Sequence, residues 1–110
     1  MAELDDDPGG EVVIATEVDA AGDPIVVVSG EIDMSNASSL SAAVAPITAT
    51  PHSRLTFDLT GVRFIDSAGL AVLVTAAATT TVSVRNPSAI VLSVIEATGL
   101  SSVLHVASES

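Results

Sequence analysis

The stretch LTFDLTGVRFIDSAGLAVL, residues 55–73, carries the strongest fold signal in the chain. Across residues 54–60, apolar and polar side chains alternate, which is typical of a β-strand with one buried face. The segment IDSAGL then opens a helix, on which apolar side chains from Leu70 to Ala77 recur three and four positions apart. A strand that leads into an amphipathic helix predicts one unit of an α/β fold.

Two runs rich in Val and Ile, residues 11–18 and 25–30, precede this unit and are separated by a Gly/Pro turn, so they predict a hairpin. A helix is predicted to follow, because N-cap residue types up to Asn36 lead into apolar residues on one helical face. Pro46 removes a hydrogen bond from that helix, so we expect the helix either to end near Val44 or to kink.

The chain after the second helix, which should stop near Ala78, predicts a strand, a third helix and a last strand. Residues 81–85 have strand composition, and Asn86 with Pro87 is typical of a helix cap followed by a first turn. Residues 101–107 form the last candidate strand. The order predicts an α/β fold with a mixed four- to five-stranded β-sheet, made of an N-terminal hairpin and then parallel βαβ units, packed with three to four α-helices.

A chain of 110 residues fits a single domain. Residues 1–10, MAELDDDPGG, predict an acidic flexible tail that ends at a Pro-Gly-Gly break. We therefore expect the domain to span residues 11–107 and a short C-terminal tail to span residues 108–110.

The charge of the chain excludes several classes of partner. The formal net charge is -11, with three arginines and no lysine. A protein that binds duplex nucleic acid needs several basic side chains to displace counterions, so we expect no nucleic-acid partner. An anionic membrane surface is an equally poor partner, whereas a basic protein surface would suit the chain electrostatically.

The residue inventory also limits the chemistry. The absence of cysteine excludes disulfides, thiolate metal sites and cysteine nucleophiles. Without lysine the chain has neither a P-loop nor a protein-kinase site, and no acidic cluster has metal-ligand spacing, so we expect no metal or cofactor. We recognise no signal peptide or membrane span and expect a cytoplasmic protein.

Ser67, in FIDSAGL, has three possible roles: a nucleophile, part of a helix cap, or a modification site. The nucleophile elbow G-x-S-x-G lacks its first glycine here. A serine triad also needs a histidine base, and neither His52 nor His105 lies in a signature context. We therefore expect that the protein is not an enzyme.

Asp66 is a suitable N-cap, because its carboxylate could accept hydrogen bonds from the amides of Ala68 or Gly69. Ser67 would then be the first helical residue and would be exposed at a fixed position. Phosphorylation would add about -1.5 to -2 charges there, favoured by the helix dipole and opposed by Asp66 next door and, if the two loops converge, by Asp33. A partner docked at Ser67 would meet new charge and bulk.

The loops at residues 30–36 and 66–69 both follow predicted strands. If those strands are parallel, the two loops lie on one rim at the carboxyl edge of the sheet.

Three segments resemble the STAS domain family, of the anti-sigma factor antagonist type. VVVSGEIDMSNASSL (26–40) is similar to the family's strand, G-E-[IL]-D motif and helix start. LTFDLTGVRFIDSAGLAVL (55–73) is similar to its strand and D-S-x-G-[LV] loop, and VRNPSAIVLSVIEATGL (84–100) to its last strand-to-helix unit. The resemblance covers residues 11–106 and implies a single STAS domain.

The resemblance also implies a function. Family members bind an anti-sigma factor, typically a kinase-type ATP-binding protein, and so free a sigma factor for transcription. The partner phosphorylates the serine after the motif aspartate, which is Ser67 here; the modified protein lets go, and a metal-dependent phosphatase usually resets it. The partner-binding and switch residues implied are Gly30, Glu31, Asp33, Ser35, Asn36, Asp66, Ser67, Ala68 and Gly69.

Some residues depart from the family pattern. Ala68 stands where many relatives have a second Ser or Thr, so Ser67 alone can carry a phosphate in this loop. The segment 75–82 is a few residues shorter than the family pattern and lacks the charges common there. Two other hypotheses remain open: a STAS module that binds its partner without phosphorylation, in a multiprotein scaffold or transport complex, and an enzyme that uses Ser67.

Overall fold

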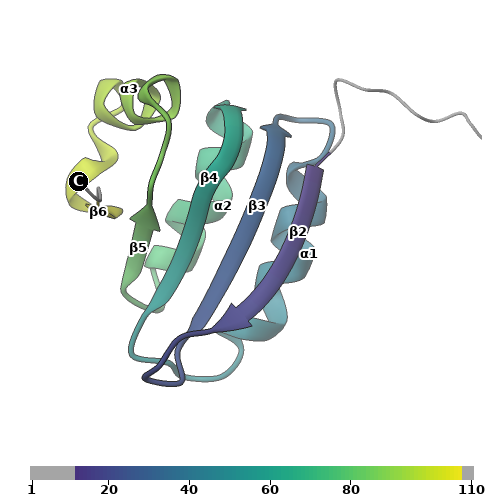
Figure 1. Cartoon of the computed structure of the whole chain (residues 1–110), viewed down its shortest axis with the longest axis vertical. Coiled ribbons are helices and arrows are strands. Elements are labelled where there is room, and N and C mark those ends of the chain that lie inside the picture. Colours follow the sequence, from purple (N-terminus) through teal and green to yellow (C-terminus); the bar gives the residue numbers. More distant parts are fainter. Residues whose placement is uncertain (1–11, 108–110) are drawn as a thin grey trace, which may run out of the picture.

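Strand β4 (Leu55–Ile65) runs through the middle of a five-stranded sheet (Figure 1). The structure is a computed structural model that describes residues 12–107, so the tails predicted at 1–10 and 108–110 lie outside the described residues. The other strands are β2 (Val12–Val18), β3 (Pro24–Ile32), β5 (Val82–Arg85) and β6 (His105–Ala107).

The strand order across the sheet is β2-β3-β4-β5-β6. Strand β2 pairs antiparallel with β3, and all other neighbours pair in parallel. The prediction of an α/β fold with an N-terminal hairpin and parallel βαβ units is therefore confirmed.

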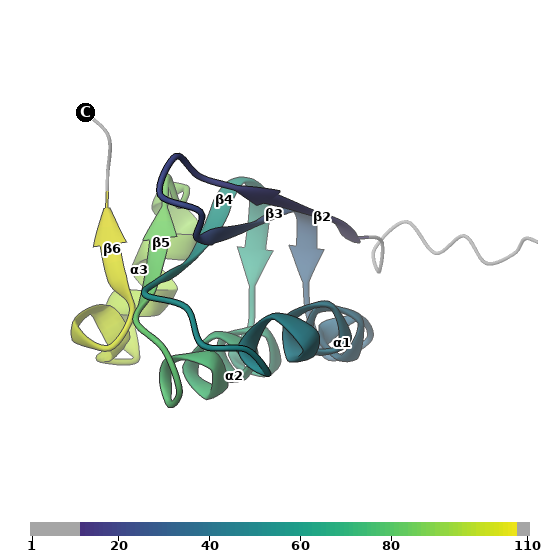
Figure 2. The same cartoon turned by 90° about the horizontal axis from the view of Figure 1, so that it is seen from below.

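Three helices connect the parallel strands: α1 (Ala37–Thr48), α2 (Ser67–Ala77) and α3 (Ala89–Ala97). A 3-10 turn, η2 (Leu100–Ser102), leads into β6. Figure 2 shows α1 and α2 side by side under one face of the sheet. Among residues 12–107, no helix lies over the opposite face of β3 and β4 (Figures 1 and 2).

The core lies between the sheet and the α1/α2 layer. Alternate residues of β4, namely Leu55, Phe57 and Leu59, are fully buried, and they meet Leu70 and Leu73 of α2 in one cluster. Burying side chains of this size stabilises the fold by about 1.5–3 kcal/mol each. Because the core is almost entirely aliphatic, α2 is held against the sheet by packing alone on its inner side.

Strand β4 is longer than the alternation predicted, since it continues from residue 60 to Ile65. The alternation breaks at Gly61, and the β3–β4 pairing shifts its register between Val27 and Ser29 and again between Gly30 and Glu31. Such bulges let a strand continue after the pattern of two is lost.

Of the two alternatives for Pro46, the one in which α1 ends near Val44 is wrong, because the helix runs through Pro46 to Thr48. The proline falls in the last turn, where it removes only one hydrogen bond before the helix ends. The predicted ends of α2 and α3 are better matched: α2 has Ala78 as its C-cap, and Gly99 follows α3 with a φ of 75°.

The expectation that Asn86 and Pro87 cap the third helix is also wrong. Asn86 adopts a left-handed conformation with φ 54°, which asparagine tolerates better than most residues. Ser88 is the N-cap instead, and its hydroxyl accepts a hydrogen bond from the amide of Val91 at 3.2 Å. The strand expected over 101–107 is reduced to β6, since η2 takes up its first residues.

Candidate functional site

The two loops predicted to share a rim do lie together. Strands β3 and β4 are parallel, and Ile32 at the end of β3 is paired with Ile65 at the end of β4. The amide of Asp66 donates to the carbonyl of Ile32 at 3.1 Å, so the start of the second loop is bonded to the start of the first. We call the surface formed by residues 30–36 and 66–69 the rim.

Asp66 caps α2 as predicted. One oxygen of its carboxylate accepts hydrogen bonds from both the Ala68 amide, at 2.9 Å, and the Gly69 amide, at 3.1 Å. Ser67 is the first helical residue and is exposed, while Ala68 is half-buried. The cap therefore presents the Ser67 side chain to solvent from a fixed backbone.

Gly69 explains how close α2 comes to the sheet. A Cβ atom on this residue would lie 2.6 Å from Cγ2 of Ile32 and 2.8 Å from Cγ1 of Ile65. Carbon atoms in contact normally lie about 3.5–4.0 Å apart, so no side chain fits. The motif glycine thus seats the first turn of α2 directly on the ends of β3 and β4.

Asp33 organises the other half of the rim. Its carboxylate accepts hydrogen bonds from the amide of Ser35 at 2.9 Å and from the Ser35 hydroxyl at 2.6 Å. The side-chain hydrogen bond from Ser35 is the largest cause that lowers the pKa of Asp33 below its ordinary value. Asp33 is therefore ionised at neutral pH and adds negative charge to the rim.

Asn36 occupies the N-cap position of α1, but its side chain makes no cap hydrogen bond. Its Oδ1 accepts from the Asp33 amide at 3.0 Å, and its Nδ2 donates to the Glu31 carbonyl at 2.8 Å. Because Asn36 is only 5% exposed, its contribution to any interface is to hold the loop in shape. Sequence reasoning grouped it with the contact residues, since burial in a loop leaves no mark in the sequence.

Two exposed apolar side chains, one in the rim and one beside it, were missed by sequence reasoning. Met34 is 78% exposed between Asp33 and Ser35, and Phe64 is 43% exposed at the end of β4, paired in register with Glu31. Arg63 reaches Glu31 with an N–O distance of 3.5 Å. The break in the alternation of β4 was the one available signal that Phe64 faces solvent.

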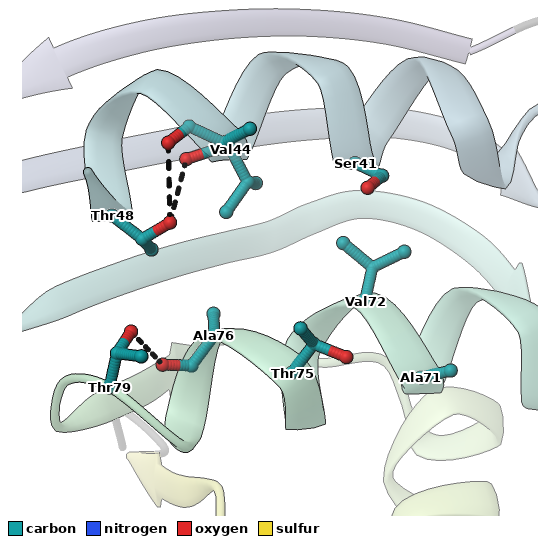
Figure 3. Close-up of a pocket in the computed structure, with 9 residues that line it drawn as sticks. Ser41, Val44, Thr48, Ala71, Val72, Thr75, Ala76 and Thr79 are labelled. Carbon is teal, nitrogen blue, oxygen red and sulfur yellow. Dashed lines mark hydrogen bonds between the residues drawn. The ribbon is translucent and has the colours of Figure 1, made fainter.

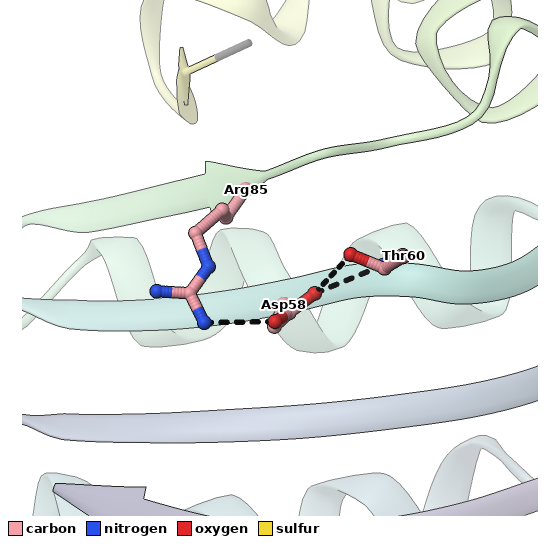
Figure 4. A network of polar contacts seen from close by, with 3 residues as sticks. All are labelled: Asp58, Thr60 and Arg85. Atoms are coloured by element: carbon pink, nitrogen blue, oxygen red, sulfur yellow. Dashed lines mark hydrogen bonds and ion pairs between the residues drawn. The ribbon is translucent and has the colours of Figure 1, made fainter. Parts of the chain in front are cut away.

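All three arginines make polar contacts to neighbouring strands. Arg85 donates to Asp58 at 2.8 Å, and Asp58 also accepts from the Thr60 hydroxyl at 2.6 Å on the helix-free face (Figure 4). Burial tends to raise the pKa of Asp58, but the hydrogen bonds from Thr60 and Arg85 outweigh it, so the pKa lies below its ordinary value. Arg54 donates to the buried Ser83 hydroxyl at 2.7 Å.

Neither histidine can serve Ser67 as a base. His52 precedes β4 whereas Ser67 follows it, and eleven strand residues span roughly 35 Å. His105 pairs with Ser83, which in turn pairs with Thr56, so it lies level with the first residues of β4. The geometry thus lacks the base that serine catalysis needs.

Metal and membrane sites were also sought within residues 12–107. No group of three or more His, Cys, Asp or Glu in this part of the chain could hold a metal ion. None of the described helices has the length and apolar character to cross a bilayer.

Comparison with known proteins places the chain in a family. A family model described as "Mlab, STAS domain" matches residues 16–105. An anti-sigma factor antagonist from Mycobacterium paratuberculosis is 30% identical, with 87% of this chain and 85% of that chain covered and a TM-score of 0.79. The chain therefore belongs to the STAS domain family, of the anti-sigma factor antagonist type that its motifs resemble.

Two more distant structures share the fold. The anti-sigma factor antagonist SpoIIAA, in its unphosphorylated form, is 17% identical over 89% of each chain, with a TM-score of 0.71. A Thermotoga maritima protein proposed to be an anti-sigma factor antagonist is also 17% identical, covering 88% of this chain and 86% of that one, with a TM-score of 0.73. A search of curated proteins gave no match.

Proposed function

We propose that this protein is an anti-sigma factor antagonist whose rim binds an anti-sigma factor of the kinase type. Binding frees a sigma factor, and phosphorylation of Ser67 by the bound partner ends the interaction. A metal-dependent phosphatase resets the serine. The proposal places the protein in the cytoplasm, where its partners act.

The observation that carries the proposal is the presentation of Ser67. The residue is exposed at the first position of α2, and its backbone is fixed by the Asp66 cap and by the close seat of Gly69. A kinase needs an accessible hydroxyl in a defined place, and the fold supplies one. The added phosphate would stand beside the carboxylates of Asp33 and Asp66, so it would change the rim from moderately to strongly negative.

The charge of the rim also indicates what the partner surface looks like. The rim holds three acidic residues, Glu31, Asp33 and Asp66, and Glu31 lies 3.5 Å from Arg63, so a basic partner surface would be complementary. Met34 and Phe64 would supply apolar contact area at the same place.

The test uses the purified protein, its cognate anti-sigma factor and Mg-ATP, followed by intact-mass measurement. We expect the mass of one phosphoryl group to be added to the wild-type chain and to be absent from Ser67→Ala. Ser67→Asp should weaken binding of the anti-sigma factor at least tenfold, which corresponds to about 1.4 kcal/mol. No phosphoryl adduct on the wild-type chain would rule out the kinase switch.

The second candidate is a STAS module that binds in a scaffold or transport complex without phosphorylation. The observation that favours it is the pair of carboxylates around Ser67, since Asp33 and Asp66 both oppose an added phosphate. Under this hypothesis Ser67→Asp would leave partner binding unchanged.

A further inference from the structure

The helical layer of this acidic protein carries no formal charge on α1 or α2. Residues 34–53 and 67–84 contain no Asp, Glu, Lys or Arg, although such residues make up 15% of the chain. Solvent-facing helices normally carry charged side chains on their outer face. Protein interfaces, by contrast, are depleted of charge at their centre.

A groove runs between α1 and α2 on this uncharged surface (Figure 3). Its volume is about 290 Å³, and its floor includes the buried side chains of Val44 and Ala76. Val44 from α1 and Val72 from α2 both point into the space between the helices. The lining residues are Ser41, Val44, Ala45, Thr48, Ala71, Val72, Thr75, Ala76 and Thr79.

The polar atoms at one end of the groove are already satisfied. The Thr48 hydroxyl lies 3.3 Å from the Ala45 carbonyl, and the Thr79 hydroxyl lies 3.3 Å from the Ala76 carbonyl (Figure 3). These hydroxyl groups therefore need no hydrogen bond from an occupant, and this end of the groove suits an apolar one.

The row of side chains that forms one wall of the groove begins at Ser67. Ser67, Ala71, Thr75 and Thr79 follow one another at intervals of four, so the first three form one row along α2. All four are exposed, and the last three line the groove. The phosphoacceptor therefore stands at the end of the same row of side chains that forms one wall.

We infer that the groove between α1 and α2 receives an uncharged, apolar helix of the anti-sigma factor, next to the partner's basic contact with the rim. The inference rests on the proposed function and deepens it. A helix is the fitting occupant because helices pack by placing the side-chain ridges of one helix into the grooves of another. The absence of charge along both walls requires that this ridge also lack charge, since a charged group buried there would have no partner.

The groove also explains how one phosphate could release the partner. A docked helix would cover the first turns of α2, so phosphorylated Ser67 would be partly desolvated against an uncharged surface. Groups that carry close to two charges resist such burial strongly. The same phosphate on a water-exposed surface would have a far smaller effect.

The experiment compares the same substitution on two sites of α1. Ala45 lines the groove and Ala42 is exposed on the same helix away from it. Ala45→Glu and Ala42→Glu change the net charge equally, so long-range attraction to a basic partner is matched. We expect Ala45→Glu to weaken binding of the purified cognate anti-sigma factor at least tenfold in calorimetry, and Ala42→Glu to stay within twofold of wild type.

Ser67→Asp is measured alongside, so that the two proposals are separated. If Ser67→Asp weakens binding but Ala45→Glu behaves as Ala42→Glu, the groove inference is wrong and the proposed function stands. If the wild-type chain does not bind the anti-sigma factor, both fail. Ala45→Leu, which fills the groove without charge, replaces Ala45→Glu if circular dichroism shows that the latter does not fold, and it should weaken binding too. Loss of a self-associated species in Ala45→Glu would assign the groove to a second copy and overturn the inference.

Discussion

Replacing Gly69 by alanine tests whether α2 is seated on the sheet as the structure describes. The new Cβ would lie 2.6 Å from Ile32 and 2.8 Å from Ile65, about 1 Å closer than carbon atoms tolerate. Both neighbours are fully buried, so neither side chain can swing away. The first turn of α2 must therefore move outward.

The magnitude is the difference between two opposed effects. Overpacking a buried contact costs about 1–3 kcal/mol, whereas alanine is favoured over glycine inside a helix by about 1 kcal/mol. We expect Gly69→Ala to lower the free energy of unfolding by about 1 kcal/mol net. In a domain of this size, that corresponds to a melting temperature about 4–8 °C lower.

Urea denaturation followed by circular dichroism measures this directly. Ala42→Gly, on the exposed side of α1, isolates the helix-propensity effect and should cost about 1 kcal/mol. Adding that value to the loss seen in Gly69→Ala gives the steric cost alone. If Gly69→Ala is as stable as wild type or more stable, the close seat of α2 is refuted. The outward shift should also slow phosphorylation of Ser67.

Three further substitutions test other parts of the structure. Asp66→Ala removes the α2 cap and should cost about 0.5–2 kcal/mol in urea denaturation; an unchanged midpoint would contradict the cap. Ser88→Ala removes the α3 cap and should likewise cost about 1 kcal/mol, whereas Asn86→Ala should leave that cap hydrogen bond intact. Because the pKa of Asp58 is lowered in the folded state, its stabilisation is present above about pH 4 and is lost as the pH falls further. Wild type and Asp58→Asn should therefore differ in stability at pH 6, and the difference should shrink as the pH falls below about 4; a constant difference would contradict the assignment.

The rim could be predicted from sequence because its parts obey local rules. Asp66 lies where a capping carboxylate belongs, and the loops after β3 and β4 had to meet once those strands were parallel. The role of Gly69 was not predictable in this way, since it depends on the distance between α2 and two isoleucines brought together by the fold. Local sequence patterns predict where helices and strands lie along the chain, but not how closely those elements pack in space.

The misassigned residues share a physical cause. Asn86 and Pro87 have the composition of a helix start, yet Asn86 adopts a left-handed conformation and Ser88 is the N-cap of α3. Pro46 was expected either to end α1 near Val44 or to kink it, but the helix, packed against the sheet, continues to Thr48. In each case tertiary contacts outweighed a preference of about 1–3 kcal/mol.

The separation of charged rim from uncharged groove has a kinetic consequence. Added salt screens the attraction between Glu31, Asp33, Asp66 and a basic partner, but it leaves apolar contacts beside Ser67 nearly unaffected. Raising the ionic strength should therefore slow association while the dissociation rate changes little. Salt would set how quickly the partner is found, and the state of Ser67 would set how long it stays.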